Sequence, residues 1–358
     1  RSGAAIPIGA PLRSRQGAAR VCAAGGDETM ARAWQLTSYP TDMPGPEHFA
    51  LVDVDLPPLG EGDVHVRNSW ISVDPYMRGR MRPGESYIPS FELDTPMEGT
   101  AVGVVVESRA PGLKAGDTVL HSQGWRDEAV GPAEAFEKLP DLPVPPESWL
   151  GLMFATGATA YFGLLHAAGA KAGDVVFVSA AAGGVGSAVV QIAKIKGMTV
   201  IGSAGGPEKC AFVRQIGADA TIDYKAPGTM EDKLRAVAPD GISVYFDNVG
   251  GDHLDAAIAC ANYGARFALC GGIAGYNMDT PPPLRNPMEI IKSGLTLRGY
   301  LLYEYMDQLA GFRTEMAGWI SDGRIRSVDT IFEGLEQAPA AFFGLFTGRN
   351  TGKMVVRL

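Results

Sequence analysis

The chain has 358 residues, a formal net charge of −9, 46% hydrophobic residues and 20% charged residues. This composition is typical of a soluble globular protein with about two domains. The negative charge argues against a nucleic-acid partner, because phosphate binding requires clustered lysines and arginines. No apolar run approaches the ~18–20 residues that span a bilayer, so we expect no membrane partner.

Residues 1–29 differ from the rest of the chain. Up to Gly26 they hold four arginines and no acidic residue, which is typical of an organelle transit peptide or its remnant. The alternative is a cloning remnant or an upstream translated segment, with Met30 as the natural start. We therefore expect a cytoplasmic protein, or a plastid or mitochondrial one if the segment is a transit peptide. The four cysteines show no C-x-x-C spacing and are expected to be reduced thiols.

The first half, from about residue 34 to 146, consists of short apolar runs separated by Gly, Pro and Asp. VHVRNSWISV (64–73) alternates like a half-buried strand, and TAVGVVVESR (100–109) predicts another. Several short strands joined by turns indicate a partly open β-barrel or a sandwich. The Pro-rich LPDLPVPPESW (139–149) marks a boundary, and the last segment, 329–358, returns to the same texture.

The second half alternates strands and helices. DVVFVSA (174–180) is a continuous apolar run, as in a strand buried on both faces. A glycine turn follows it, and then a helix to Gly197, a strand over 198–204 and a helix over 207–217. ATIDY, ISVYFDNVG and ARFALCGG continue the pattern. This alternation predicts a doubly wound parallel sheet of the α/β class.

The glycine turn reads A-x-G-x-x-G, with Ala181, Gly183 and Gly186 at its fixed positions. A turn between a buried strand and a helix presents backbone N–H groups and the helix N-terminus to an anion. Gly183 and Gly184 allow the backbone to approach a pyrophosphate, and Gly186 allows close packing of helix and strand. We therefore predict a dinucleotide site rather than a plain turn.

The end of the second strand predicts which dinucleotide binds. An NAD site places an acid there to hold the ribose 2′-hydroxyl, but residues 203–206 are Ser-Ala-Gly-Gly, and Lys209 follows in the next helix. A lysine attracts a 2′-phosphate that a carboxylate would repel. NADPH is therefore the predicted cofactor.

The histidines and cysteines show no spacing typical of a zinc site, so we predict no metal. Without a Lewis acid, simple alcohol oxidation is disfavoured. Reduction of a C=C bond conjugated to a carbonyl fits better, because a hydroxyl donor can support the enolate while hydride adds to the β-carbon.

Motifs along the chain resemble one family. SVDPYMRGRM (72–81), TAYFGLL (159–165), VSAAAGGVGS (178–187), YFDNVGG (245–251) and GRNTGK (348–353) are similar to the zinc-free branch of the medium-chain dehydrogenases/reductases. Within it they resemble the NADPH-dependent alkenal/one oxidoreductases, which include prostaglandin reductases and plant double-bond reductases. The resemblance implies a GroES-like catalytic domain (30–150 and 329–358) and a Rossmann NADPH-binding domain (151–328). It also implies a homodimer.

The resemblance also implies site residues. Tyr276 is implied as the proton donor or the residue that orients the enone, and Tyr76 as part of the opposite wall. The implied cofactor-binding residues are Gly183, Gly184, Val185, Gly186, Ser187, Lys209, Tyr224, Asn248, Cys270, Gly271, Tyr276, Tyr300, Leu301, Leu302 and Asn350. The loop Pro281–Pro287 is expected to move over the pocket.

The predicted activity is NADPH-dependent reduction of the C=C bond of α,β-unsaturated aldehydes or ketones as small-molecule substrates, with hydride to the β-carbon and a proton to the α-carbon. The alternatives are an NADPH quinone oxidoreductase of the same superfamily, and a non-catalytic NADPH-binding protein. Turnover of enones, of quinones alone, or of neither would distinguish the three.

Overall fold

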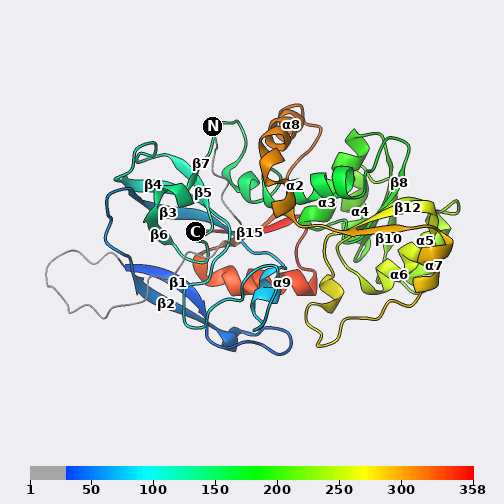
Figure 1. The fold of residues 1–358 in the computed structure, drawn as a ribbon, viewed down its shortest axis with the longest axis horizontal. Helices are drawn as coiled ribbons and strands as arrows, with labels where there is room; N and C mark the ends of the chain where they lie inside the picture. The colour runs from blue at the N-terminus through cyan, green and yellow to red at the C-terminus, as the bar shows by residue number, and fades with distance from the viewer. Residues whose placement is uncertain (1–29) are drawn as a thin grey trace.

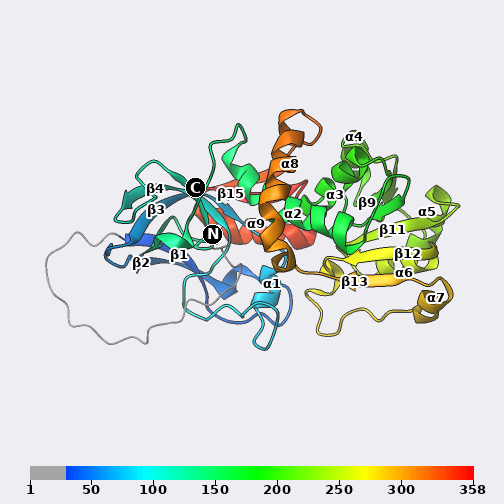
Figure 2. The ribbon, with the colours of Figure 1, turned by 45° about the horizontal axis from the view of Figure 1, so that its top comes forward.

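The computed structural model describes residues 30–358. The transit-peptide prediction falls on residues 1–29 and so lies outside the described part of the chain. Figures 1 and 2 show two parts side by side, one built mainly of strands and one of strands and helices. None of the helices found in residues 30–358 has both the length and the apolar character needed to traverse a bilayer.

The first part contains a seven-stranded sheet in the order β14-β15-β3-β4-β5-β7, with β6 also paired to β3. The predicted strands over 64–73 and 100–109 are confirmed within one residue at each end. In β3, buried and exposed side chains alternate over the first half, as expected for a strand with one face on a core. The elements are β1 (Met30–Leu36), β2 (Phe49–Asp55), β3 (Asp63–Ser72), α1 (Met77–Arg80), β4 (Ala101–Ser108), β5 (Thr118–His121), β6 (Glu128–Pro132), β7 (Glu137–Lys138), β14 (Asp329–Glu333), α9 (Ala338–Thr347) and β15 (Lys353–Arg357), with short helical turns at Pro46–His48, Ala133–Ala135 and Leu335–Gln337.

The second part is a six-stranded sheet in the order β10-β9-β8-β11-β12-β13, and every pair in it is parallel. This is the doubly wound order in which ligands bind beyond the carboxyl ends of the central strands. Its elements are α2 (Ala155–Phe162), β8 (Val175–Val178), α3 (Gly184–Ile195), β9 (Thr199–Ala204), α4 (Pro207–Gln215), β10 (Ala220–Asp223), α5 (Met230–Val237), β11 (Ile242–Asp247), α6 (Gly251–Ala259), β12 (Ala261–Leu269), α7 (Pro287–Lys292), β13 (Thr296–Gly299) and α8 (Leu309–Ser321), with short helical segments at Pro146–Leu150, Gly163–Ala167, Ile273–Gly275 and Leu302–Gln308.

Helices cover both faces of this second sheet. In Figure 1, α3 and α4 lie on one side of the strands and α5 to α7 on the other. The central strand β8 is buried along three of its four residues, which explains its unbroken apolar sequence. Helix α3 is buried continuously from Gly186 to Ala193, as expected for a helix packed between the sheet and other elements. The α/β class and the doubly wound parallel sheet are therefore confirmed.

The two parts meet where β15 begins. The amide of Gly352 donates to the carbonyl of Ala182 over 2.7 Å. The next residue, Lys353, is 5% exposed, and its ammonium donates to the Val73 carbonyl, the Asp74 carboxylate and the Met354 carbonyl at 2.8–3.0 Å. The other carboxylate oxygen of Asp74 accepts from the Ser72 hydroxyl. One buried cation thus joins the end of β3 to the start of β15, beside the glycine turn.

We expect Lys353→Met to destabilise the protein by about 3–5 kcal/mol, because it leaves the Asp74 carboxylate buried without its cation. The matched control is Lys292→Met, which breaks the exposed Lys292–Glu289 pair and should cost about 0.5 kcal/mol. Urea unfolding followed by tryptophan fluorescence measures both. Equal losses of unfolding free energy in the two variants would show that the buried pair stabilises the protein no more than an exposed pair does.

Candidate active site

A cavity of about 790 Å³ lies beyond the carboxyl ends of β8, β9, β11 and β12 and reaches the end of β3. This size and position are typical of a cofactor site in an open α/β sheet. The predicted residues that line it are Tyr76, Gly183, Gly184, Val185, Gly186, Lys209, Tyr224, Asn248, Cys270, Gly271, Tyr276, Tyr300, Leu301, Leu302 and Asn350. The structure thus brings together segments that are up to 274 positions apart in the sequence.

Ser187 is the predicted residue that does not line the cavity. It is buried in the first turn of α3, its amide donates to the Gly183 carbonyl, and its hydroxyl donates to the Gly184 carbonyl at 3.2 Å. Both polar groups are therefore used inside the helix. Ser187 therefore does not line the cavity, whereas Gly184 to Gly186 do.

The glycine turn leaves no room for side chains. A Cβ at Gly186 would lie 2.2 Å from the Ala180 carbonyl oxygen, and one at Gly184 would lie 3.1 Å from Thr156 Cγ2. The absence of these side chains allows α3 to pack against the end of β8 with its first turn at the cavity wall. The backbone at the N-terminus of α3 can therefore approach an anion closely.

Two lysines stand at one end of the cavity. Lys209 and Lys225 both line it, and burial followed by the repulsion of Lys225 lowers the pKa of Lys209. The Lys209 ammonium donates to the Gly348 carbonyl at 2.8 Å. Tyr224 packs over Gly205, where a Cβ would lie 2.7 Å from the phenolic oxygen. This end can hold a phosphate and the ring system attached to it.

The nearby carboxylate of Asp223 does not line the cavity and is bonded to backbone amides. Its Oδ1 accepts hydrogen bonds from the amides of Gly206 and Lys225 at 2.8 and 2.9 Å, and the pKa of Asp223 is lowered mainly by the first of these bonds. At the tip of β9, the Ser203 hydroxyl instead pairs with His253 Nε2 at 2.9 Å. Burial lowers the pKa of His253 to about 4, so this imidazole is neutral at pH 7.

The middle of the cavity is formed by the loops after β11 and β12. Asp247 is buried, and its Oδ1 accepts from the amides of Val249 and Gly250 at 2.9 and 2.8 Å and from the Tyr245 phenol at 2.7 Å. Burial raises the pKa of Asp247. The Asn248 side-chain amide donates to the Ser179 carbonyl at 2.8 Å. These bonds fix the shape of the loop, so Asn248 presents its backbone and its remaining amide atoms to the cavity.

The two predicted tyrosines stand on different walls of the cavity. Tyr76 immediately precedes α1, and Tyr276 ends the helical turn after Gly272. Burial raises the pKa of Tyr276 to about 12, and the pKa of Tyr76 is raised further by burial and by Asp74. The Gly272 amide donates to the Tyr276 oxygen at 3.4 Å. Both phenols therefore keep their protons at neutral pH and can act as uncharged hydrogen-bond donors.

Several lining residues were not predicted from the sequence. Lys225 directly follows Tyr224, so the sequence could have predicted its position beside a phosphate site. Lys353 lies in a quoted motif, but its role depends on the contact with Asp74. Tyr87 comes from a polar loop without a motif and is 60% exposed.

The loop Pro281–Pro287, expected to move over the pocket, is not among the segments that line the cavity. The Arg285 guanidinium pairs with Asp255 and Asp252 on α6, and the Arg285 amide donates to Asp255 at 2.9 Å. These pairs hold the loop against α6. The sequence showed the prolines but gave no sign of the partners of Arg285.

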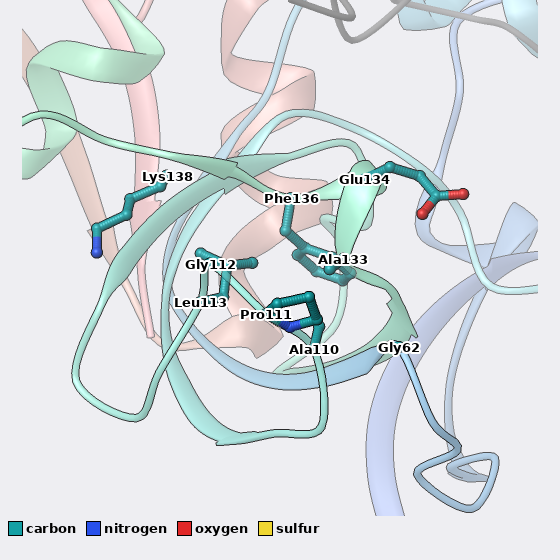
Figure 3. Close-up of a pocket in the computed structure, with 9 residues that line it drawn as sticks. All are labelled: Gly62, Ala110, Pro111, Gly112, Leu113, Ala133, Glu134, Phe136 and Lys138. Carbon is teal, nitrogen blue, oxygen red and sulfur yellow. The ribbon is translucent and has the colours of Figure 1, made fainter.

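A second hollow, of about 480 Å³, lies in the first part of the molecule (Figure 3). Phe136 lies over it, whereas the charged ends of Glu134 and Lys138 point away. It offers no convergent polar groups. Across residues 30–358, no three His, Cys, Asp or Glu side chains come together in a group that could hold a metal ion.

Comparisons with known proteins agree with this geometry. Residues 32–139 match the family model described as the N-terminal domain of oxidoreductase, and residues 184–317 match the one described as zinc-binding dehydrogenase. NADPH-dependent curcumin reductase of Escherichia coli is 39% identical, over 91% of this chain and 96% of its own length. The NADP(+)-dependent 2-alkenal reductase of Nicotiana tabacum is 37% identical over 90% of this chain and 95% of its own length.

A solved structure shows the same fold. The crystal structure of CurA from Vibrio vulnificus in complex with NADPH is 39% identical and superposes with a TM-score of 0.86. The match covers 91% of this chain and 98% of the solved one.

Proposed function

Because the chain belongs to the medium-chain dehydrogenase/reductase superfamily, in its branch of NADPH-dependent alkenal/one oxidoreductases, we propose that it reduces the C=C bond of α,β-unsaturated aldehydes and ketones. One observation carries the proposal. A single cavity holds a glycine turn and two lysines at one end and two uncharged phenols at the other. The first end fits a phosphorylated dinucleotide, and the second fits a carbonyl compound.

The residues of the first end fit NADPH. The glycine turn lines the cavity at the start of α3, where backbone N–H groups can bind the pyrophosphate. Lys209 and Lys225 supply positive charge for a 2′-phosphate, and Gly205 and Gly206 follow β9 where NAD sites carry an acid. The same residues therefore favour NADPH over NADH.

The chain's own part in the reaction is to orient the substrate and to support charge. NADPH, when bound, supplies the hydride that adds to the β-carbon of the substrate. The Tyr276 phenol donates a hydrogen bond to the carbonyl oxygen, where negative charge develops, and supports protonation at the α-carbon. Tyr76 forms the facing wall and restricts how the enone can lie.

The first test measures NADPH oxidation at 340 nm with a panel of 2-alkenals, enones and quinones. We expect enone turnover with NADPH and weak turnover with NADH. Lys209→Met should raise the KM for NADPH about 10–100-fold, because a charge-assisted bond to phosphate is lost, and should change the KM for NADH less than about threefold. Lys171→Met, an exposed lysine outside the cavity, is the control. Turnover of quinones alone would assign the protein to the quinone oxidoreductases instead.

The second test concerns Tyr276. We expect Tyr276→Phe to lower kcat about 100-fold, the usual effect of removing one oxyanion donor, with little change in the KM for NADPH. Since the pKa of Tyr276 is raised to about 12, its phenol stays protonated and kcat of the wild type should not fall between pH 7 and pH 9. Tyr263→Phe changes an 86% exposed tyrosine and serves as the control. A kcat for Tyr276→Phe within threefold of the wild type would exclude the phenol as the donor.

We further propose that the chain forms a homodimer through the edge of its second sheet. Strand β13 ends that sheet, and an unpaired edge favours pairing with another copy. Exposed apolar side chains lie on the neighbouring helix, namely Met288 and Ile291 on α7.

We expect the wild type to sediment as a dimer and Ile291→Glu to sediment as a monomer, because a charge on this face opposes burial. The control is Ile331→Glu on β14, which is equally apolar but lies at the edge of the other sheet. Analytical ultracentrifugation gives the answer directly. Dimers in both variants would place the interface elsewhere.

A further inference from the structure

Two arginines, Arg78 in α1 and Arg82 just after it, connect the first part of the molecule to the segment that carries Tyr276. The Arg78 Nε donates to the Asn277 side-chain carbonyl at 2.8 Å, and the Arg82 guanidinium donates to the Met278 carbonyl at 3.1 Å. Asn277 and Met278 directly follow Tyr276. Figure 2 places α1 at the boundary between the two parts. These bonds therefore bridge the cavity on the side where the two tyrosines stand.

Arg78 holds a third segment at the same time. Its Nη2 donates to the carbonyl oxygens of Pro40, Thr41 and Asp42 at 3.3, 3.4 and 2.9 Å. Asn277 also reaches this segment, because its side-chain amide donates to the Met43 sulfur at 3.2 Å. One guanidinium thus sits at the meeting point of loop 40–43, α1 and the segment after Tyr276.

The burial of Arg78 and the nature of its hydrogen-bond acceptors restrict the geometry of this junction. The residue is 0% exposed, and its hydrogen-bond acceptors are backbone carbonyls and one amide rather than a carboxylate. Burial lowers the pKa of Arg78 to about 10, so the guanidinium remains charged at pH 7. A buried cation that depends on neutral acceptors is stable only while each acceptor stays in place. The planar guanidinium also fixes the directions of its bonds, which a lysine cannot do.

We propose that Arg78, assisted by Arg82, is a positioning residue that locks Tyr276 at a fixed place opposite Tyr76. This proposal rests on the reductase function proposed above. Tyr76 lies two residues before Arg78, and Tyr276 lies one residue before Asn277, so a single guanidinium sets the separation of the two phenols. Arg78 itself does not line the cavity and therefore acts through Asn277.

The first test uses Asn277, because truncating the Arg78 side chain also releases loop 40–43 and can unfold the chain, whereas Arg78→Lys keeps a buried cation there. Asn277→Ala removes the acceptor, whereas Asn277→Asp keeps an oxygen for Arg78. We expect Asn277→Ala to lower kcat about 30-fold, since a misplacement of about 1 Å can cost 100-fold, with the Kd for NADPH within twofold of the wild type. Asn277→Asp should recover kcat to within about fivefold of the wild type. Asn286→Ala, whose side chain makes no cap bond at α7, is the matched control.

A double-mutant cycle adds a readout that general destabilisation does not produce. If Arg78 acts through Asn277, then Arg78→Lys combined with Asn277→Ala should be no slower than the worse single variant. Multiplied losses in the double variant, or a kcat for Asn277→Ala within twofold of the wild type, would overturn the proposal.

Hydrogen exchange tests the positioning role of Arg78 and Asn277 independently of enone turnover. In the NADPH complex, amides 273–278 should exchange faster in Asn277→Ala and at the wild-type rate in Asn277→Asp, while the strands of the second sheet are unchanged. This result without any enone turnover would support the lock and refute the proposed function. Enone turnover with unchanged exchange in Asn277→Ala would refute the lock and leave the proposed function standing.

Discussion

The buried ammonium of Lys353 is the contact on which the arrangement of the two sheets depends. It bonds to the Val73 carbonyl, the Asp74 carboxylate and its neighbouring Met354 carbonyl, and the amide just before it reaches back to Ala182 in the glycine turn. The C-terminal strand therefore does two things at once. It completes the first sheet by pairing with β3, and it holds that sheet against the turn that cradles the cofactor. A cation is suited to this place because a carbonyl-rich junction with one carboxylate needs a donor with several hydrogens.

Much of this arrangement could be predicted from the sequence, because it depends on local pattern. The unbroken apolar run of β8 and the alternation of strands and helices predicted a doubly wound sheet, and the glycines after β8 predicted an anion site at that turn. Residues 203–206 contain no acid, and this absence predicted a cofactor that carries a 2′-phosphate. The structure places all of these elements around one cavity.

The rest depends on contacts between distant residues, and no local pattern encodes them. Arg78 was quoted as part of a motif, but its partner Asn277 lies 199 positions away. The prolines of 281–287 suggested a mobile loop, but they gave no sign that Arg285 pairs with Asp252 and Asp255 on α6. Ser187 was assigned to the cofactor because it ends the glycine motif, yet the helix uses its hydroxyl internally. Tyr87 sits in a loop whose composition is merely polar. In each case the side chain's role is set by what the fold brings to it.

The distribution of charge inside the cavity explains which substrates it suits. Lys209 and Lys225 stand at the adenosine end, and the other charged pair that lines the cavity, Asp74 with Lys353, is mutually neutralised. The tyrosine end therefore offers phenols that burial keeps protonated, with no net charge beside them. In such a low-dielectric place, a phenol stabilises the charge that develops on a carbonyl oxygen more than it stabilises the neutral carbonyl. A charged substrate head would have to lose its hydration without gaining a counter-ion. The same features that favour the transition state of an enone thus select for uncharged carbonyl compounds.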